Sequence, residues 1–235
     1  MPGMALPQPF WTNTTITRIA VLSRGNAMNS APIRVLACSP RAKGNTDFMV
    51  HNFVQGVRGS GGTAEVSYLR DYTIMPCTGC HACAESPTSR CILANRDDAE
   101  KLFQLIIDAP LVLIAAPIFF YALPAQLKAF VDRAQRFWAK RERERQAGTW
   151  KACPTPKPAI VSLVAARNRG DKMFEGSLLT LQYFFDLFDT RIADTCQLLG
   201  YNASDDLTAD GVACQRLYEM GAKAQALVIE QAGRP

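Results

Sequence analysis

The hydrophobic pattern becomes regular at Pro32, and from there short apolar runs alternate with amphipathic segments. Three runs are mostly apolar, as is typical of strands that are buried on both faces of a parallel sheet. They span residues 33–38, 111–117 and 157–166. Residues 64–69 alternate between apolar and polar, which predicts a strand at the edge of the sheet, and residues 191–200 contain a fifth strand.

Helical periodicity lies between and after these strands. The predicted helices span residues 46–58, 97–107, 124–138, 177–188 and 208–231, and Asp97 and Asp98 lie in the first turn of the second one. Strands that alternate with helices predict a parallel sheet that is covered by helices on both faces. Because no internal repeat and no linker divides residues 32–235, we expect one α/β domain there, with a cysteine-rich loop at about residues 71–95.

Residues 1–31 contain three prolines and no acidic residue, and their pattern does not continue into the domain. We therefore expect a poorly ordered N-terminal extension. It lacks the basic start and apolar centre of a secretory signal. The longest near-apolar stretch, residues 109–125, is interrupted by three prolines and is too short to span a bilayer. These features predict a cytoplasmic protein that does not associate with membranes.

The formal net charge is +5, but the excess of basic residues precedes Asp47, before which there is no acidic residue. A nucleic-acid-binding protein carries its basic residues in a stripe across the folded body, so this distribution argues against nucleic acid as a partner. One basic run stands out later, RFWAKRERERQAGTWK at 136–151. It is either a solvated helix end or a rim that attracts a phosphorylated cofactor or an acidic redox partner.

The segment that follows the first strand, SPRAKGNT at 39–46, predicts a phosphate site. It places hydroxyl, amide and guanidinium donors at a helix N-terminus, where backbone N–H groups are free and the helix dipole favours anions. The donors are Ser39, Arg41, Asn45 and Thr46. Neither a G-x-G-x-x-G fingerprint nor a Walker Lys-Ser/Thr pair is present. A monophosphate therefore fits best, which indicates FMN rather than FAD or ATP.

Four segments of the chain resemble the flavodoxin-like NAD(P)H-dependent FMN reductase superfamily, and in particular its iron–sulfur flavoprotein branch. They are S-x-R-x-x-G-N-T at 39–46, APIFFYALPAQLKAFVDRAQRF at 116–137, the cysteine run with the Asp97-Asp98 pair after it, and GDKMFEG at 170–176. The resemblance covers about residues 32–232. It implies a three-layer sandwich with a five-stranded parallel sheet in the order 2-1-3-4-5.

The resemblance also implies where FMN binds. The phosphate would be held by Ser39, Arg41, Asn45 and Thr46. The isoalloxazine and ribityl groups would be lined by Pro117, Ile118, Phe119, Phe120, Tyr121 and Ala122, and approached from the other side by Ala165, Arg167 and Gly170. All three segments follow predicted strands, and ligands of open α/β sheets bind beyond the carboxyl ends of the strands. Core packing is the alternative for the three aromatic residues, but three consecutive side chains of a loop cannot all point inward.

Half of the eight cysteines fall within fifteen residues, as Cys77, Cys80, Cys83 and Cys91. The C-x2-C-x2-C spacing is that of bacterial [4Fe–4S] proteins, and Cys91 is near enough to supply the fourth ligand. Structural zinc more often uses two C-x2-C pairs that are a dozen or more residues apart. A [4Fe–4S] cluster is therefore the leading hypothesis. Zinc and unligated, redox-active thiols remain open as alternatives.

These features together predict an FMN-dependent oxidoreductase of the iron–sulfur flavoprotein type. The chemistry takes place on the FMN, so no side chain is needed as an acid or a base. The expected partners are a ferredoxin-like electron donor, a small-molecule acceptor, and further copies of the chain in a homodimer or homotetramer. One alternative is an NAD(P)H-dependent FMN or quinone reductase without a cluster, with NAD(P)H as its co-substrate. A second alternative is a flavin-binding redox sensor.

Overall fold

Five parallel strands form one sheet in the order β2-β1-β3-β4-β5. The computed structural model describes residues 31–233. The strands are β1 (Ile33–Ala37), β2 (Ala64–Tyr68), β3 (Val112–Pro117), β4 (Lys157–Ala165) and β5 (Thr190–Leu199). The predicted strands and their order are confirmed. The strand with the alternating pattern, β2, lies at the edge of the sheet, as its pattern predicts.

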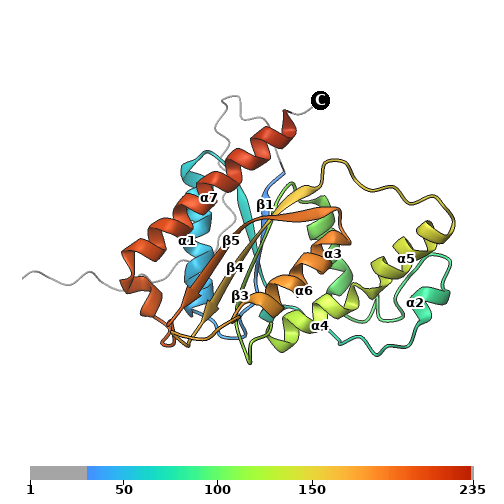
Figure 1. Cartoon of the computed structure of the whole chain (residues 1–235), viewed down its shortest axis with the longest axis horizontal. Coiled ribbons are helices and arrows are strands. Elements are labelled where there is room, and N and C mark those ends of the chain that lie inside the picture. Colours follow the sequence, from blue (N-terminus) through green and yellow to red (C-terminus); the bar gives the residue numbers. More distant parts are fainter. Residues whose placement is uncertain (1–30, 234–235) are drawn as a thin grey trace, which may run out of the picture.

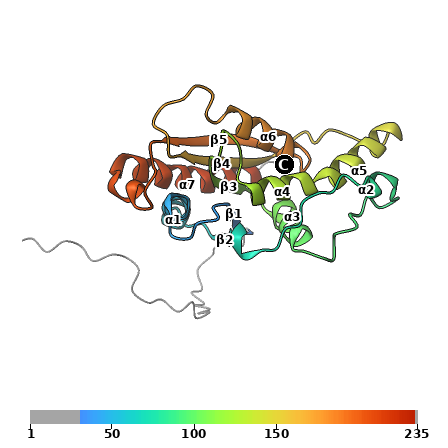
Figure 2. The same cartoon turned by 90° about the horizontal axis from the view of Figure 1, so that it is seen from below.

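Helices cover both faces of this sheet (Figures 1 and 2). They are α1 (Asn45–Gly59), α2 (Ala82–Glu85), α3 (Ala99–Asp108), α4 (Ala125–Arg133), α5 (Gln135–Gln146), α6 (Glu175–Asp186) and α7 (Gly211–Ala232). One core packs α1 and α7 against the sheet, and a second core packs α3, α4 and α6 against the opposite face. The three-layer sandwich is therefore the predicted one. Within residues 31–233 no helix combines the length and the apolar character that crossing a bilayer requires.

Two close contacts set the positions of the helices that carry candidate site residues. The backbones of α1 and α7 touch, because a Cβ atom at Gly56 would lie 1.9 Å from the Tyr218 carbonyl oxygen. On the other face, the Phe103 ring of α3 stacks on Phe130 of α4 with 4.5 Å between the ring centroids. Phe184 of α6 lies 5.7 Å from the same Phe130 ring. The first contact holds the C-terminal half of α1 against α7, and the second holds α4 against α3 and α6.

The helix predicted at 124–138 is wrong as a single element, because α4 ends at Arg133 and α5 begins at Gln135. The Ala134 N–H donates to the Val131 carbonyl, three residues back, so the last turn tightens here. Beyond the break α5 continues to Gln146. Periodicity missed this extension because its stability comes from distant partners of the arginines, which are described below.

Two predicted helix starts also shift. Helix α3 begins at Ala99, so Asp97 and Asp98 precede it and do not lie in its first turn. The Asp97 carboxylate is instead part of a buried ion pair with Arg133. Helix α7 begins at Gly211, where the Asp210 carboxylate accepts a hydrogen bond from the Ala213 N–H at 2.9 Å. The predicted extension at 1–31 lies outside the described residues apart from its last residue.

Candidate functional site

The start of α1 offers free backbone donors at the carboxyl edge of the sheet (Figure 1). The Phe48 N–H donates to the Gly44 carbonyl, which closes the first helical turn. The N–H groups of Asn45, Thr46 and Asp47 therefore have no acceptor within the helix. Among the described residues no side chain caps this end either. Such an end attracts anions because its N–H groups and the helix dipole point outward.

The four predicted phosphate ligands take different positions in this segment. Arg41 is exposed, and its guanidinium lies over Gly44, where a Cβ atom would approach Arg41 Nε to 2.9 Å. Ser39 and Thr46 are buried, and the Ser39 hydroxyl accepts a hydrogen bond from the Arg41 N–H at 3.1 Å. The bare backbone of Gly44 and the guanidinium over it form a small cradle.

The Asn45 side chain differs from its predicted role. Its amide nitrogen donates to the carbonyls of Tyr201 at 3.2 Å and Ala203 at 2.7 Å, and its oxygen accepts from the Leu207 N–H at 3.2 Å. The amide is therefore committed to the segment after β5. Asn45 holds the start of α1 in place, and its backbone N–H is the part that is left to face an anion.

A second ion pair, which sequence reasoning missed, orders the same loop. Both Arg70 Nη atoms donate to the Asp47 carboxylate, at 2.9 and 2.8 Å, and Asp47 also accepts from the Lys43 N–H at 2.8 Å. Lys43 has the left-handed φ of 56°, so this bond supports a strained turn. Arg70 follows the edge strand β2, and its place at a strand end was the only signal in the sequence.

The segment after β3 is a tight hairpin that exposes aromatic side chains. Phe119 and Ala122 exchange two backbone hydrogen bonds of 3.0 Å each. The two residues between them, Phe120 and Tyr121, both have left-handed φ values, of 50° and 61°. Glycine and asparagine are the usual residues at such positions, and a bulky residue there costs about 1–3 kcal/mol. Strain of this kind gathers at functional sites.

All three aromatic side chains of this hairpin are exposed, and Phe120 is fully so. Core packing is therefore the wrong interpretation for them. The hairpin contacts the segment after β4 through Tyr121, whose hydroxyl accepts from Arg167 Nη1 at 3.4 Å. A Cβ atom at Gly170 would lie 3.0 Å from the same hydroxyl oxygen. Ala165 is buried at the end of β4, so of the predicted residues here Arg167 and Gly170 are the ones that reach the surface.

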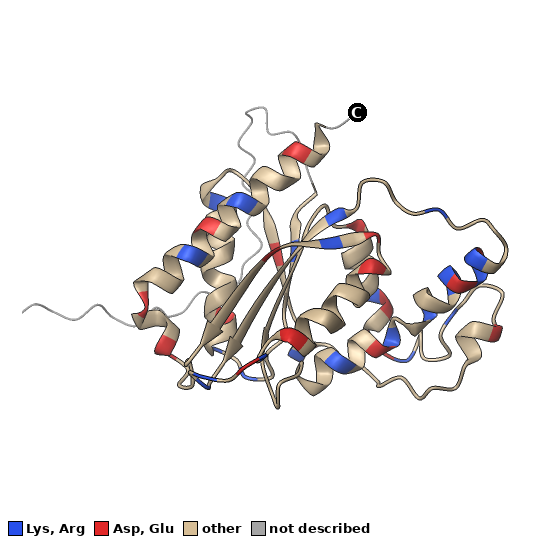
Figure 3. Cartoon of the chain, viewed as in Figure 1, with Lys and Arg blue, Asp and Glu red and all other residues tan. Residues whose placement is uncertain are grey.

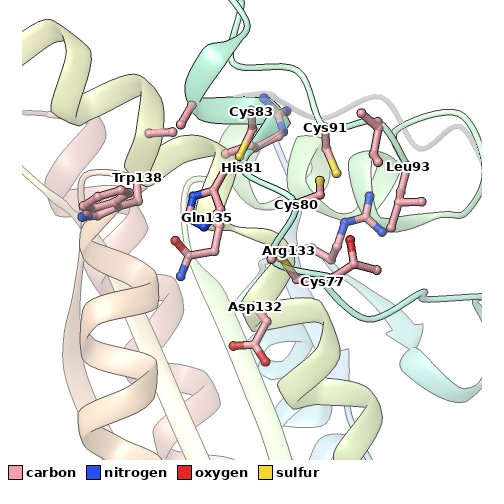
Figure 4. A pocket seen from close by; sticks show the side chains of 16 residues that line it. Cys77, Cys80, His81, Cys83, Cys91, Leu93, Asp132, Arg133, Gln135 and Trp138 are labelled. Carbon is pink, nitrogen blue, oxygen red and sulfur yellow. The ribbon is translucent and has the colours of Figure 1, made fainter.

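A second candidate site is a cavity of about 400 Å³ between the cysteine loop and the α4–α5 junction. All four clustered cysteines line it, together with residues such as Arg133 and Trp138 (Figure 4). They are Cys77, Cys80, Cys83 and Cys91. The fold therefore brings the predicted ligand set together in one place. Among residues 31–233, however, no three His, Cys, Asp or Glu side chains are placed to share a single metal ion.

The thiols of this cavity differ in their electrostatics. Burial raises the pKa of Cys83, and the charges of Cys91, Cys77 and Cys80 raise it further, so the four sulfur atoms interact. The pKa of Cys80 is lowered, first by the Ala82 N–H and then by the Thr78 hydroxyl. Cys80 is thus more readily deprotonated than Cys83, and a thiolate is the form that ligates metals.

Arg143 of α5 holds the cysteine loop. Its guanidinium donates to the carbonyls of Ser86 at 2.6 Å and Pro87 at 2.7 Å, with longer contacts to Ala84 and Cys83 at 3.3 and 3.5 Å. These carbonyls end or follow the four-residue helix α2, where backbone acceptors lack helical partners. The arginine therefore clamps the loop to α5, and this explains why the helix extends so far.

Other arginines of the basic run also have internal partners, although the charges alternate along α5 (Figure 3). Arg136 pairs with Glu100, and Arg141 is buried against Asp186 and Asp189. Arg145 lies over the Trp150 ring at 4.6 Å. The run is therefore neither a simple solvated helix end nor a free basic rim, and its main contribution is to join α5 to the cysteine loop and to α6.

Arg133 lines the cysteine cavity and is also bonded to a buried residue of the protein core. Its side chain and that of Asp97 are both fully buried and form an ion pair. Arg133 Nη1 also donates to the Met75 carbonyl at 3.1 Å, and the Met75 N–H donates to Asp97 at 2.8 Å. Burial lowers the pKa of Arg133, but Asp97 and Cys91 outweigh this effect and raise it.

Comparisons with known proteins agree with this architecture. The family model for NADPH-dependent FMN reductase matches residues 31–176. An iron–sulfur flavoprotein of Methanocaldococcus jannaschii is 30% identical over 97 residues, which are 41% of this chain and 48% of that protein. A protein of Bacillus subtilis named as an NAD(P)H-dependent FMN-containing oxidoreductase is 26% identical over 136 residues, which are 58% of this chain and 67% of that protein.

The chain thus matches less than half the length of the iron–sulfur flavoproteins of M. jannaschii and Archaeoglobus fulgidus. Among solved structures, a flavone reductase is similar with a TM-score of 0.59 and 13% identity, over 86% of this chain and 65% of that one. This likeness confirms the flavodoxin-like fold. Because the matching family model covers more than half of its residues, the chain belongs to the NADPH-dependent FMN reductase family.

Proposed function

We propose that this protein is an FMN-dependent oxidoreductase that uses both FMN and a [4Fe–4S] cluster, as an iron–sulfur flavoprotein does. The observation that carries the proposal is the cavity that all four clustered cysteines line. The parallel sheet of the same chain has the loops after β1, β3 and β4 at its carboxyl edge, where FMN would bind. The names of the partial relatives support the same reading.

The residues at the carboxyl edge of the sheet fit FMN. The free N–H groups at the start of α1 and the Arg41 guanidinium would bind the phosphate, because each is a donor at an end that already favours anions. The Ser39 hydroxyl, which donates to the Arg41 carbonyl at 3.1 Å, would hold the loop in shape around the phosphate. The strained hairpin holds Phe120 and Tyr121 outside the core, where an isoalloxazine ring needs contacts. Bound FMN supplies electron transfer in one- or two-electron steps.

The residues of the cysteine cavity fit a four-iron cluster better than zinc. One zinc ion would need its thiolates about 4 Å apart, given Zn–S distances of about 2.3 Å. The thiolates of a [4Fe–4S] cluster each bind a different iron and lie further apart. Cys77, Cys80, Cys83 and Cys91 line one cavity, and their C-x2-C-x2-C spacing is that of [4Fe–4S] proteins and not that of two separated zinc pairs. The ligand set and its spacing along the chain support the cluster.

Analysis of protein purified without oxygen tests the proposal. We expect a brown protein with one FMN, acid-labile sulfide and about four irons per chain. The variant Cys83→Ala should lose the iron and keep the FMN, because the two sites lie on different parts of the fold. Stoichiometric zinc, or yellow protein without iron, would refute the cluster. Release of FMN together with iron on this substitution would refute separate sites.

An NAD(P)H-dependent FMN or quinone reductase without a cluster is the second candidate. It is favoured by the family model and by the longer match to the B. subtilis protein. In that case the protein is yellow and oxidises NADPH rapidly, and replacement of Cys83 leaves the rate of NADPH oxidation unchanged. Rates measured on wild type and Cys83→Ala with NADPH as the only donor separate the two candidates.

We further propose that the protein works in the cytoplasm as a homodimer or homotetramer, with a ferredoxin-like donor and a small-molecule acceptor. None of the eight cysteines, all of which lie among the described residues, is in a disulfide, as is usual in a reducing compartment. The fully exposed Phe120 and half-exposed Trp138 are aromatic side chains that another copy of the chain could cover. Sedimentation equilibrium of the FMN-loaded protein tests this, and a monomer at micromolar concentration would refute it.

A further inference from the structure

Arg133 is a buried cation with unused hydrogen-bonding capacity. Only 1% of the residue is exposed. Its Nη1 atom binds Asp97 and the Met75 carbonyl, but its Nε and Nη2 atoms have no hydrogen-bond partner among the described residues. A buried donor without a partner is destabilising, and more so when it is charged. Two such donors on one guanidinium therefore point to an acceptor at the cavity that Arg133 lines.

The unused donors lie at the cysteine cavity. Arg133 is one of the residues that line it, and Figure 4 shows its side chain below Cys91 and Cys80. Asp97 is not a lining residue of the cavity, although it is paired with Arg133. The ion pair therefore presents its positive end to the four sulfur atoms.

We propose that Arg133 is a positioning residue that stabilises the negative charge of the cluster and so raises its reduction potential. This inference rests on the proposed function. A cluster with four thiolate ligands is anionic, and its reduction by one electron from a ferredoxin-like donor adds one further negative charge. Arg133 neither gains nor loses a proton or an electron in that step. Its fixed charge stabilises the reduced form more than the oxidised form, because the reduced form is the more negative one.

Hydrogen bonds to sulfur and the local net charge are the levers by which proteins set the potentials of such clusters. Arg133 supplies both at this cavity, which Arg136 also lines. The ion pair with Asp97 fixes the guanidinium before a cluster is bound, so Arg133 need not move when the cluster is reduced. The same pair prevents Arg133 from turning toward solvent. The position thus has the properties of a tuning residue and not merely those of a buried structural arginine.

The test compares three variants by redox titration of the cluster, followed by its visible and electron paramagnetic resonance spectra. Arg133→Met combined with Asp97→Asn removes the cation without leaving an unpaired carboxylate. Arg133→Lys keeps the charge but loses the forked donors. Arg141→Lys is the matched control, because Arg141 is also buried and ion-paired but does not line the cysteine cavity.

We expect the double variant to lower the ratio of reduced to oxidised cluster at a fixed potential about tenfold, which is about 59 mV for a one-electron couple. Arg133→Lys should recover part of this shift, and Arg141→Lys should show none. FMN content should stay at the wild-type value in all three. If the double variant does not fold, Arg133→Lys alone still has to lower the potential.

An unchanged potential in iron-loaded Arg133→Lys and double variants would overturn the inference and leave the proposed function intact. So would an equal shift in Arg141→Lys, because a shift from outside the cavity would show a nonspecific effect. Loss of iron from Arg133→Lys at wild-type FMN content would also overturn it, since lysine supplies the same charge. Wild-type protein without iron would instead refute the proposed function itself.

Discussion

Replacing Arg143 with methionine should free the cysteine loop without unfolding the domain. The substitution keeps most of the apolar stem of the side chain and removes the guanidinium that binds the loop carbonyls. Two of the four contacts are short, to Ser86 at 2.6 Å and Pro87 at 2.7 Å, and two are long, at 3.3 and 3.5 Å. The short pair therefore carries most of the effect.

The size of the effect follows from these two bonds. A hydrogen bond from a charged group contributes about 1.5–3 kcal/mol when buried, and Arg143 is only half-buried, so about 1 kcal/mol for each short bond is appropriate. The loop thus loses about 2 kcal/mol of local stability. Since 1.4 kcal/mol is a factor of ten, local opening should become about thirtyfold more frequent.

Hydrogen exchange of the loop amides measures this directly. The N–H groups of Ser86 and Ser89, which donate to Ala82 at 2.9 Å and Ser86 at 3.0 Å, should exchange about thirtyfold faster. Amides of β3 should be unchanged. Arg145→Met is the control, because Arg145 lies over Trp150 and, within residues 31–233, makes no hydrogen bond to the loop. Equal exchange in wild type and Arg143→Met, or acceleration that extends to β3, would refute the clamp.

Three further predictions concern the edge of the sheet. Arg41→Ala should weaken FMN binding about tenfold or more, because a charge-assisted phosphate contact is lost, and an unchanged Kd in fluorescence titration would place the phosphate elsewhere. Phe120→Gly should raise thermal stability by about 1 kcal/mol, because it relieves a strained φ, and a lower Tm would contradict the strain. The same substitution should weaken FMN binding, because it removes the aromatic ring. Tyr201→Phe should raise the pKa of Asp210, which the Tyr201 hydroxyl lowers in the wild type. Because the pKa of Asp210 is depressed on folding, its contribution to stability is present near neutral pH and is lost as the pH falls through that pKa. Carbon-detected NMR titration measures the pKa of Asp210, and equal pKa values in wild type and Tyr201→Phe would rule out the role of the Tyr201 hydroxyl.

The sequence predicts those parts of the molecule that local patterns determine. Apolar runs locate β1, β3 and β4, because both faces of these strands are buried and the runs therefore contain few polar residues. The place of the phosphate segment follows from strand order and chain direction alone. The cysteine spacing likewise predicts a shared site, since residues that are so close in sequence cannot lie far apart.

What the sequence does not reveal depends on partners that are distant in the chain. The Arg133–Asp97 pair joins residues 36 positions apart, and the Arg143 clamp spans 57 positions to Ser86. In a periodic pattern these arginines look like the polar face of a long helix. Their burial ends α4 at Arg133 and extends α5, which is why the predicted single helix at 124–138 was wrong. The side-chain partners of Asn45 were missed for the same reason, because they lie after β5.

Helix α4 gives the two candidate sites a fixed relation to each other. Its first residue, Ala125, follows the aromatic hairpin at the edge of the sheet, and its last residue, Arg133, lines the cysteine cavity. Nine helical residues span about 13 Å. The stacking of Phe130 on Phe103 holds this helix against the sheet, so the helix cannot tilt without disturbing the core. If both cofactors bind as proposed, the packing of α4 therefore sets the path between them within one chain, and a cavity at Phe130 should alter the rate of electron exchange without a change in either ligand set.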